Sequence, residues 1–426
     1  MATDDESWKE VENNPHCMEI VQNTPHMHYS IDPPFFRILR DDAPQMPYTR
    51  TTGMEKTRLH WGQRKLLMSE IEFLTIVGRE ELRDGLIVYA GAAPGNHVIY
   101  LHELFPEASF LLVDPAPFNR ELVRLRLPNV EFVHDIFTDE LAVRIARREA
   151  GRRAIYFISD IRTADPEQIR DGVRISRAEV EMKVREDQAN QMRWHELVGS
   201  RRSMLKFRLP WDVSTPDTPD VDYTPITEYL DGDIFLPVWG PVCTSECRLI
   251  TKKDRPLRRK EYDNKKYESQ MMYFNNVTRH SLYPHNVTGE GLDHCYDCAA
   301  EIRILKRYQR TFHDIARWTA LGQVVSEMSS RISRVLCGEH RNLTDPNPDP
   351  EERLRGIRRT QQPDGRAAYE RAHQRWRGHR GMNEPLGEDE DISLLPTCTC
   401  LVKQGPQPPH ASCLDTNYLV YRFLSR

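Results

Sequence analysis

The chain has 426 residues, of which 39% are hydrophobic and 29% charged, so it is long enough for one large domain with appendages or for two modest domains. Its formal net charge of -5 argues against a protein that coats nucleic acid non-specifically, although a basic groove can still exist locally. No apolar stretch is long enough to span a bilayer, and the acidic, polar start of the chain does not resemble a secretory signal.

The first elements are an arm and a helix. Residues 1–50 are rich in Pro, His, Asp and Met without clear periodicity, which indicates an extended arm packed on the core. Residues 55–78 have apolar positions at helical spacing, and Gly78 is typical of a helix C-terminus. Gln63 and Lys65 lie near the start of this helix, and on local grounds alone Lys65 would be an ordinary solvated lysine.

The segment 86–114 reads as strand, glycine turn, helix and second strand. Leu86–Ala90 and Phe110–Val113 are short apolar runs of the kind found in buried parallel strands. Gly91 and Gly95 bracket the turn GAAPG, where a ligand can approach the backbone without Cβ interference. Asp114 ends the second strand, where this architecture places an acid that binds ribose.

The turn itself indicates which nucleotide-like cofactor it binds. Dehydrogenases use the spacing G-x-G-x-x-G against a pyrophosphate, whereas this turn has a different spacing and a proline. It therefore suits S-adenosylmethionine better. The alternative is a tight turn in a doubly wound protein that binds no such cofactor.

Downstream, the helical and strand patterns continue to alternate. Residues 120–127 and 139–150 have helical patterns, with a strand at 130–133 between them. Ala154–Ser159 is a buried strand that ends at Asp160, and a carboxylate at that end of a parallel strand faces the ligand crevice.

The next stretch carries two further charged residues on predicted strands. After a polar amphipathic helix at 176–198, the strand 203–209 places Lys206 in an apolar context, where an unpaired lysine is costly. Residues 212–232 read as a loop rich in Pro and Asp. A strand pair follows at 234–238 and 243–250, with Glu246 on the second strand. The basic run 252–260 reads as a solvated loop, with phosphate contact or a nuclear-import patch as alternatives.

Two lysines and two carboxylates from these elements form one candidate site. They are Lys65, Asp160, Lys206 and Glu246. A neighbouring like charge and partial burial lower the pKa of a lysine, while acids hold the side chains in place. A lysine with a pKa of roughly 7–8 can act as a general base at neutral pH, which suits removal of a proton from a ribose hydroxyl that attacks a sulfonium methyl.

The order Lys, Asp, Lys, Glu resembles the K-D-K-E tetrad of RNA ribose 2′-O-methyltransferases. The words WGQRKLL, YAGAAPGNH, LLVD, FISDIR, LKFRLPW, SECRLI and KYESQMMYFNN appear in the family's order. They resemble the poxvirus-type cap-specific mRNA 2′-O-methyltransferases, a branch whose founding member also serves as a poly(A) polymerase stimulatory subunit. The resemblance covers residues 48–337 and extends to viral and kinetoplastid members.

This resemblance implies a role for each matching residue. It makes Lys206 the general base, oriented and tuned by Asp160 and Lys65, with Glu246 in support. It assigns S-adenosylmethionine to Gln63, Tyr89, Gly91, Gly95, Asp114 and Arg162. It places Trp211 against the 7-methylguanine, with Glu268 at the edge of that base, Asp212 as a second acid, Tyr48 as an opposing ring and Arg208 on the RNA. A methylated guanine is positively charged, so an aromatic face and a carboxylate favour it over plain guanine.

The sequence also departs from the family. Cys243 replaces a tyrosine that stands three residues before the tetrad glutamate, and Pro115-Ala116 replaces a glycine and an arginine that help to hold the cofactor. Two other functions stay open: a non-catalytic RNA-processing or polyadenylation subunit on the same fold, and a methyltransferase of rRNA or tRNA ribose.

The expected architecture is an α/β, Rossmann-like methyltransferase with a mostly parallel central sheet flanked by helices and a C-terminal appendage. The core spans 51–337, with helices over 298–337, and is followed by a charged linker at 338–394 and a tail at 395–426 that forms a hairpin. The cysteines, including Cys295 and Cys298, are interpreted as reduced thiols rather than a metal site. The expected partners are the capped mRNA 5′ end and the capping or polyadenylation machinery, with no membrane. The nucleus is the expected location, and the cytoplasm, including viral factories, is the alternative.

Overall fold

A computed structural model describes residues 35–48, 62–163, 169–170, 173–214, 223–240, 244–253, 258–282 and 296–313, together with 324–325, 328–329, 331–332 and 336. The expected linker at 338–394 and the expected hairpin at 395–426 lie outside the described residues. So does much of the helical region predicted after 313.

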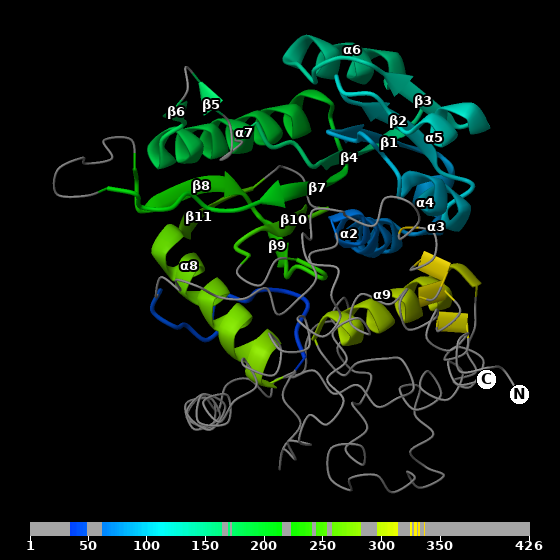
Figure 1. Cartoon of the computed structure of the whole chain (residues 1–426). Coiled ribbons are helices and arrows are strands. Elements are labelled where there is room, and N and C mark those ends of the chain that lie inside the picture. Colours follow the sequence, from blue (N-terminus) through cyan, green and yellow to red (C-terminus); the bar gives the residue numbers. More distant parts are fainter. Residues whose placement is uncertain are drawn as a thin grey trace, which may run out of the picture.

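A seven-stranded sheet forms the centre of the molecule (Figure 1). Five neighbouring strands are parallel, as predicted, and β10 then runs antiparallel between β7 and β9. In spatial order the strands are β3 (Val130–Val133), β2 (Ser109–Val113), β1 (Gly85–Ala90), β4 (Ala154–Ser159), β7 (Arg202–Phe207), β10 (Cys247–Thr251) and β9 (Gly232–Phe235).

The central strands are buried on both faces because helices cover the sheet on each side. Every residue of β1 is buried, which explains the continuous apolar run that the sequence shows there. The chain runs outward from β1 through β2 to β3 and then returns to β4 on the other side of β1. The strand order therefore reverses at the carboxyl ends of β1 and β4, which is the usual ligand position in such sheets.

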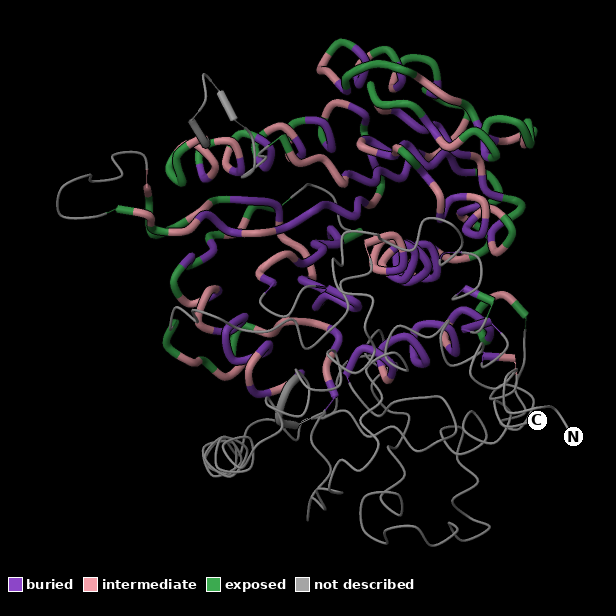
Figure 2. Tube along the Cα trace, viewed as in Figure 1, coloured by how far each residue is buried: buried purple, intermediate pink, exposed green. Residues whose placement is uncertain are grey.

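The helices form a layer on each side of the sheet (Figures 1 and 2). α6 and α7 pack together on one side, and α2, α4 and α9 on the other, where the hydroxyl of Tyr308 in α9 donates to the carbonyl of Leu104 in α4 at 2.6 Å. Among the described residues, no helix is both long and apolar enough to cross a membrane. The helices are α2 (Gly62–Val77), α3 (Arg79–Arg83), α4 (Val98–Leu104), α5 (Arg120–Leu125), α6 (Asp139–Glu149), α7 (Arg177–Leu197), α8 (Asn264–Tyr273) and α9 (Tyr296–His313), with a π-helix at Phe274–Leu282.

The prediction of loops at 212–232 and 252–260 was wrong in part, because both segments contain strand residues. The stretch 212–232 contains β8 (Ile226–Leu230), which pairs antiparallel with β11 (Arg259–Asp263) at the end of the basic run. Charges of this run are neutralised by acids, since Lys252 pairs with Asp233 at 2.7 Å. Ion pairs of this kind argue against a free phosphate-binding loop in the described part of the run. The chain also forms a two-residue pair of β5 (Ile169–Arg170) and β6 (Val173–Arg174).

The described part of the N-terminal arm packs on the sheet. The amide of Leu39 donates to the carbonyl of Ile234 at 2.7 Å, so the arm extends along the edge strand β9. Arg37 is buried and its guanidinium pairs with Glu72 of α2 at 2.7 Å. This contact anchors the arm to the helix that carries Lys65.

Candidate active site

The carboxyl edge of the sheet brings the four predicted charged residues together. Asp160 directly follows β4, and Lys206 is the penultimate residue of the parallel neighbour β7. Glu246 precedes β10, and because β10 is antiparallel its start lies at the same edge. Lys65 reaches this edge from α2.

The side chains of these residues form one ion-pair network. Lys65 Nζ lies 2.7 Å from Glu246 Oε1. Lys206 Nζ lies 3.2 Å from Asp160 Oδ1 and 3.6 Å from Glu246 Oε2. Each lysine therefore contacts an acid, and Glu246 bridges the two lysines.

A fifth charged residue, Arg248, completes the network and was missed in the sequence. Its guanidinium contacts Asp160 Oδ1 at 2.7 Å and Glu246 Oε1 at 3.0 Å, and the residue is only 5% exposed. The available signal was an arginine in the apolar strand C-R-L-I-T, since a buried arginine requires acidic partners. With Arg248, three cations surround two carboxylates.

This excess of positive charge determines the protonation of the cluster. Burial would raise the pKa of Glu246, but Lys65, Lys206 and Arg248 hold that pKa well below its ordinary value. Likewise, burial would raise the pKa of Asp160, but Lys206 and Arg248 lower it. The pKa of Lys65 is lowered, first by burial and then by Arg248 and Lys206 against the opposing effect of Glu246. The site thus contains two firmly ionised acids beside a lysine that loses its proton more easily than usual.

The glycine turn lies against the same edge. Gly91 has φ of +80°, and an added Cβ there would lie 3.1 Å from the backbone carbon of Asp160. The amide of Asp160 donates to the carbonyl of Ala90 at 3.0 Å. Gly91 therefore allows a close approach between the turn and the end of β4, which a side chain would block. Gly95 also has a positive φ, at +71°.

Asp114 shapes this turn from the end of β2. Its Oδ2 accepts a hydrogen bond from the amide of Ala93 at 3.0 Å, and its Oδ1 accepts one from the amide of Ala116 at 2.8 Å. Each carboxylate oxygen has a second lone pair, so Asp114 can still accept hydrogen bonds from ribose hydroxyls.

The other predicted cofactor residues are less uniform. Tyr89 is fully buried in β1, and its hydroxyl donates to Glu70 of α2 at 2.7 Å. Gln63 contacts His97, the residue before α4, at 2.8 Å. Arg162 lies 3.8 Å from Asp187, and burial lowers the pKa of Arg162. Its two terminal nitrogens are buried without a hydrogen-bond partner in the described part of the chain.

A second group of predicted residues brings aromatic rings together. The rings of Tyr48 and Trp211 lie 5.5 Å apart, nearly perpendicular at 74°. The guanidinium of Arg208 lies 5.9 Å from the Trp211 ring. Glu181 of α7 accepts both arms of Arg208, at 2.8 and 2.9 Å, and the Trp211 amide at 3.1 Å. Arg208, predicted to contact RNA, is therefore paired with an acid that also fixes Trp211.

Two acids accompany these rings. The pKa of Glu268 in α8 is raised, first by burial and also by the charge of Asp212, against the opposing effect of Lys265. Asp212 also accepts a hydrogen bond from the amide of Ser214 at 3.0 Å. The side chain of Tyr223 lies in the same electrostatic neighbourhood, because both acids raise its pKa after burial. The departure at Cys243 lies outside the described residues.

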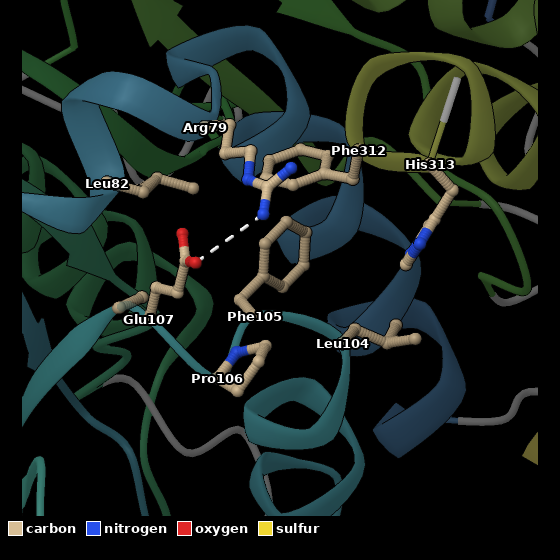
Figure 3. Close-up of a pocket in the computed structure, with 9 residues that line it drawn as sticks. Arg79, Leu82, Leu104, Phe105, Pro106, Glu107, Phe312 and His313 are labelled. Carbon is tan, nitrogen blue, oxygen red and sulfur yellow. Dashed lines mark hydrogen bonds and ion pairs between the residues drawn. The ribbon is translucent and has the colours of Figure 1, made fainter.

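Elsewhere the described surface offers little for catalysis. No group of three or more His, Cys, Asp or Glu side chains in the described ranges is arranged to hold a metal ion. Cys298 is buried, and Cys295 is outside these ranges. A separate open pocket is lined mainly by apolar side chains such as Leu104 and Phe105, with the Arg79–Glu107 pair at its side (Figure 3).

A family model described as "Poly A polymerase regulatory subunit" matches residues 30–308. The chain is 28% identical over 273 residues to a cap-specific mRNA (nucleoside-2′-O-)-methyltransferase of Myxoma virus (strain Lausanne), covering 59% of this chain and 72% of the relative. It is 29% identical over 229 residues to the protein of the same name from Fowlpox virus (strain NVSL), covering 51% and 68%.

Proposed function

The chain belongs to the poly A polymerase regulatory subunit family, and on this basis we propose that it is an S-adenosylmethionine-dependent methyltransferase of a ribose 2′-hydroxyl near the 5′ cap of mRNA. The observation that carries the proposal is the cluster of Lys65, Asp160, Lys206 and Glu246 beside the glycine turn. Relatives named as cap methyltransferases support the same reaction.

The residues beside the glycine turn fit the cofactor. Gly91 keeps a side chain out of the space next to Asp160, and Asp114 offers carboxylate lone pairs for ribose. When bound, S-adenosylmethionine supplies a methyl group on a positively charged sulfur. Gln63, Tyr89, Gly91, Gly95, Asp114 and Arg162 would hold it.

Lys206 acts as the general base in this proposal. In its neutral form its Nζ would take the proton of the ribose hydroxyl, which makes that oxygen a better acceptor for the methyl group that the cofactor would supply. Asp160 and Glu246 orient the amine through their contacts at 3.2 and 3.6 Å. Lys65 and Arg248 contact the same two acids, so they help to hold the carboxylates that orient Lys206.

The rings and acids beyond Lys206 form the proposed cap site. A base stacked between two rings needs a separation of about 7 Å, twice the usual contact distance. The Tyr48 and Trp211 rings are 5.5 Å apart and not parallel, so cap entry requires Tyr48, which is 46% exposed, to turn outward. Trp211 stays fixed through Glu181, and Glu268 and Asp212 supply the negative charge that a methylated base attracts.

The deciding experiment uses labelled S-adenosylmethionine and three short RNAs that differ only at the 5′ end: 7-methylguanosine-capped, guanosine-capped and uncapped. We expect label in the first RNA alone, at a ribose that nuclease mapping identifies. Lys206→Met should abolish labelling, whereas Lys252→Ala, a change at an exposed lysine paired with Asp233, should not. Thermal unfolding of both variants verifies that they are folded.

Each other outcome has a definite meaning. Equal labelling of all three RNAs would show that the protein does not recognise the cap, and it would favour an rRNA or tRNA ribose methyltransferase. Binding of capped RNA without transfer of label would favour a non-catalytic processing subunit. Trp211→Ala separates cap binding from chemistry: it should weaken competition by free cap analogue about tenfold or more, as expected for the loss of one stacking ring, while label transfer persists at saturating RNA.

A further inference from the structure

Residues 40–48 of the N-terminal arm form a strap that runs beside α8 (Figure 1). The amide of Ala43 donates to the carbonyl of Arg40 at 3.1 Å, so the strap begins with a turn. Farther along, the amide of Met46 donates to the carbonyl of Ser269 in α8 at 2.9 Å. The strap ends at Tyr48, whose ring lies against Trp211 in the proposed cap site.

The side chain of Gln270 in α8 holds the turn of the strap. Its Nε2 atom lies 3.1 Å from the carbonyl oxygen of Arg40, 3.2 Å from that of Asp41 and 3.3 Å from that of Ala43. Carbonyl oxygens can only accept, so these three determine that the NH2 group of Gln270, and not its oxygen, faces the strap. Gln270 is 5% exposed, so its hydrogen bonds are shielded from water.

Contacts on either side of this turn also fasten the strap. Asp41 pairs with Lys260 of β11 at 2.8 Å on the surface. The side chain of Met46 packs against Tyr273 and Val277, which follow Gln270 along the chain. Because the Met46 amide is bonded to α8, the backbone of Tyr48 lies two residues from a fixed point, while its ring, which is 46% exposed, is able to turn.

The strap is held by the same turn of α8 that carries the acid of the proposed cap site. Glu268, Ser269 and Gln270 are consecutive residues. Glu268 is the acid proposed to lie at the edge of the base, and its two neighbours hold the strap through the hydrogen bonds to Met46 and to the turn. One helical turn therefore sets the position of both the acid and the segment that carries the second ring.

We propose that Gln270 is a positioning residue for cap recognition: it holds the strap on α8 so that Tyr48 stays within reach of a base stacked on Trp211. This inference rests on the proposed function, because it assumes a capped RNA. A strap that is held before the cap arrives loses little conformational freedom on binding, whereas a loose strap must be ordered at that moment, which weakens affinity. The role depends on the N–H donors of Gln270, since only donors can join three carbonyl oxygens.

The test compares two ligands by calorimetry on the full chain: 7-methylguanosine triphosphate as the cap analogue, and S-adenosylmethionine. Gln270→Met keeps the length of the side chain but removes the donors, so the Kd for the cap analogue should rise about three- to tenfold, as for the ordering of a loose segment. The Kd for S-adenosylmethionine should stay within about twofold. Gln309→Met is the matched control, because Gln309 is a buried glutamine of α9 whose amide contacts Met328, and both Kd values should stay unchanged.

A double-mutant cycle and kinetics supply readouts that a merely structural role would not move. Tyr48→Ala alone should weaken binding of the cap analogue about tenfold, as for the loss of one stacking ring. Because Gln270 acts through Tyr48, Gln270→Met should weaken binding no further in the Tyr48→Ala background. In Gln270→Met itself, KM for capped RNA should rise while kcat at saturating RNA changes little.

Hydrogen exchange on the wild-type protein keeps the inference testable even if Gln270→Met fails to fold. The Met46 amide should exchange slowly before any cap analogue is added, because its hydrogen bond to Ser269 is already formed. Fast exchange that slows only when the cap analogue binds would show that the strap is not held in advance, and would overturn the inference.

The binding experiments can overturn the inference in other ways. Additive effects of Gln270→Met and Tyr48→Ala would mean that Gln270 does not act through that ring. Equal weakening of both ligands in Gln270→Met would indicate a general loss of structure. If wild-type protein bound no cap analogue, the proposed function would fail; if it bound the analogue and Gln270→Met bound it equally well, the positioning role alone would fail.

Discussion

Arg248 lies closer to Asp160 than the proposed base does: its Nη2 is 2.7 Å from Asp160 Oδ1, whereas Lys206 Nζ is 3.2 Å away. An arginine remains charged at any working pH, so it provides a permanent positive potential among groups that titrate. Asp160 therefore contacts two different cations. Arg248 stays charged, whereas Lys206 must lose its proton to act as the proposed base.

Replacing Arg248 should change the pH dependence of catalysis. Arg248→Gln removes a charge that lowers the pKa of Lys65, so the pKa of Lys65 should rise and this lysine should keep its proton to higher pH. Because Lys65 pairs with Glu246, which also contacts Lys206, the limb of the kcat profile to which Lys65 contributes should move to higher pH. The measurement is label transfer to capped RNA across the pH range.

Arg248→Lys is the matched control because it retains the charge and should retain the wild-type profile more nearly. A loss of activity in Arg248→Gln that is equal at every pH would contradict this electrostatic role. Such a result would instead mean that Arg248 only stabilises the position of β10.

Cap binding should weaken in mild acid. The pKa of Glu268 is raised above the ordinary 4.5, first by burial and then by Asp212. A carboxylate with a raised pKa protonates at higher pH than an exposed glutamate, so affinity for cap analogue should fall as the pH drops through that raised value. Fluorescence titration of the protein with cap analogue at a series of pH values measures the midpoint.

Two variants identify the titrating group. Asp212→Asn removes the repulsion and should shift the midpoint toward lower pH. Glu268→Gln should bind weakly with little pH dependence over the same interval. If the wild-type midpoint survived unchanged in Glu268→Gln, another group would be responsible.

The stability of the fold should depend strongly on Glu301. This α9 residue receives Arg64 of α2 at 2.6 Å, and the Trp239 indole donates to it at 2.7 Å. Arg64 and Glu301 are almost fully buried, so Glu301→Gln leaves the arginine charge without its carboxylate. We expect a loss of about 3–5 kcal/mol in the free energy of unfolding, measured by urea denaturation.

Glu107→Gln provides the comparison, since Glu107 pairs with Arg79 on the surface at 3.5 Å. An exposed pair is screened by water and its loss should hardly move the transition. Equal effects of the two changes would show that the buried pair adds no more than the surface pair.

The central strands could be predicted because burial on both faces leaves an apolar run in the sequence, as in Leu86–Ala90. β8 could not be predicted in the same way. Its burial begins only at Tyr229, and its partner β11 lies about thirty residues away, beyond the reach of local periodicity. The conformation of β8 depends on pairing with a distant strand, so its own residues show no clear strand pattern.

The candidate site was likewise predictable only in part. Asp160 and Lys206 could be located from strand ends, because parallel strands meet at one edge. Arg248, Glu70 and Glu181 were missed because helix and strand patterns do not reveal what a polar side chain contacts in three dimensions. Arg208 shows the consequence, since its partner Glu181 is on a helix that the sequence presents only as polar.

The antiparallel course of β10 concentrates all the chemistry at one edge of the sheet and leaves the opposite edge free for protein engineering. The turns that precede β4 and β7 lie at that opposite edge, and the space beside Gly151 and Gly199 is open, although both have positive φ, at +69° and +65°, and should themselves stay glycine. Fluorophores, affinity tags or a fused domain can be attached through these turns without approaching Lys206. The connection before Glu246 has no such freedom, because each residue inserted there would displace a member of the charged cluster.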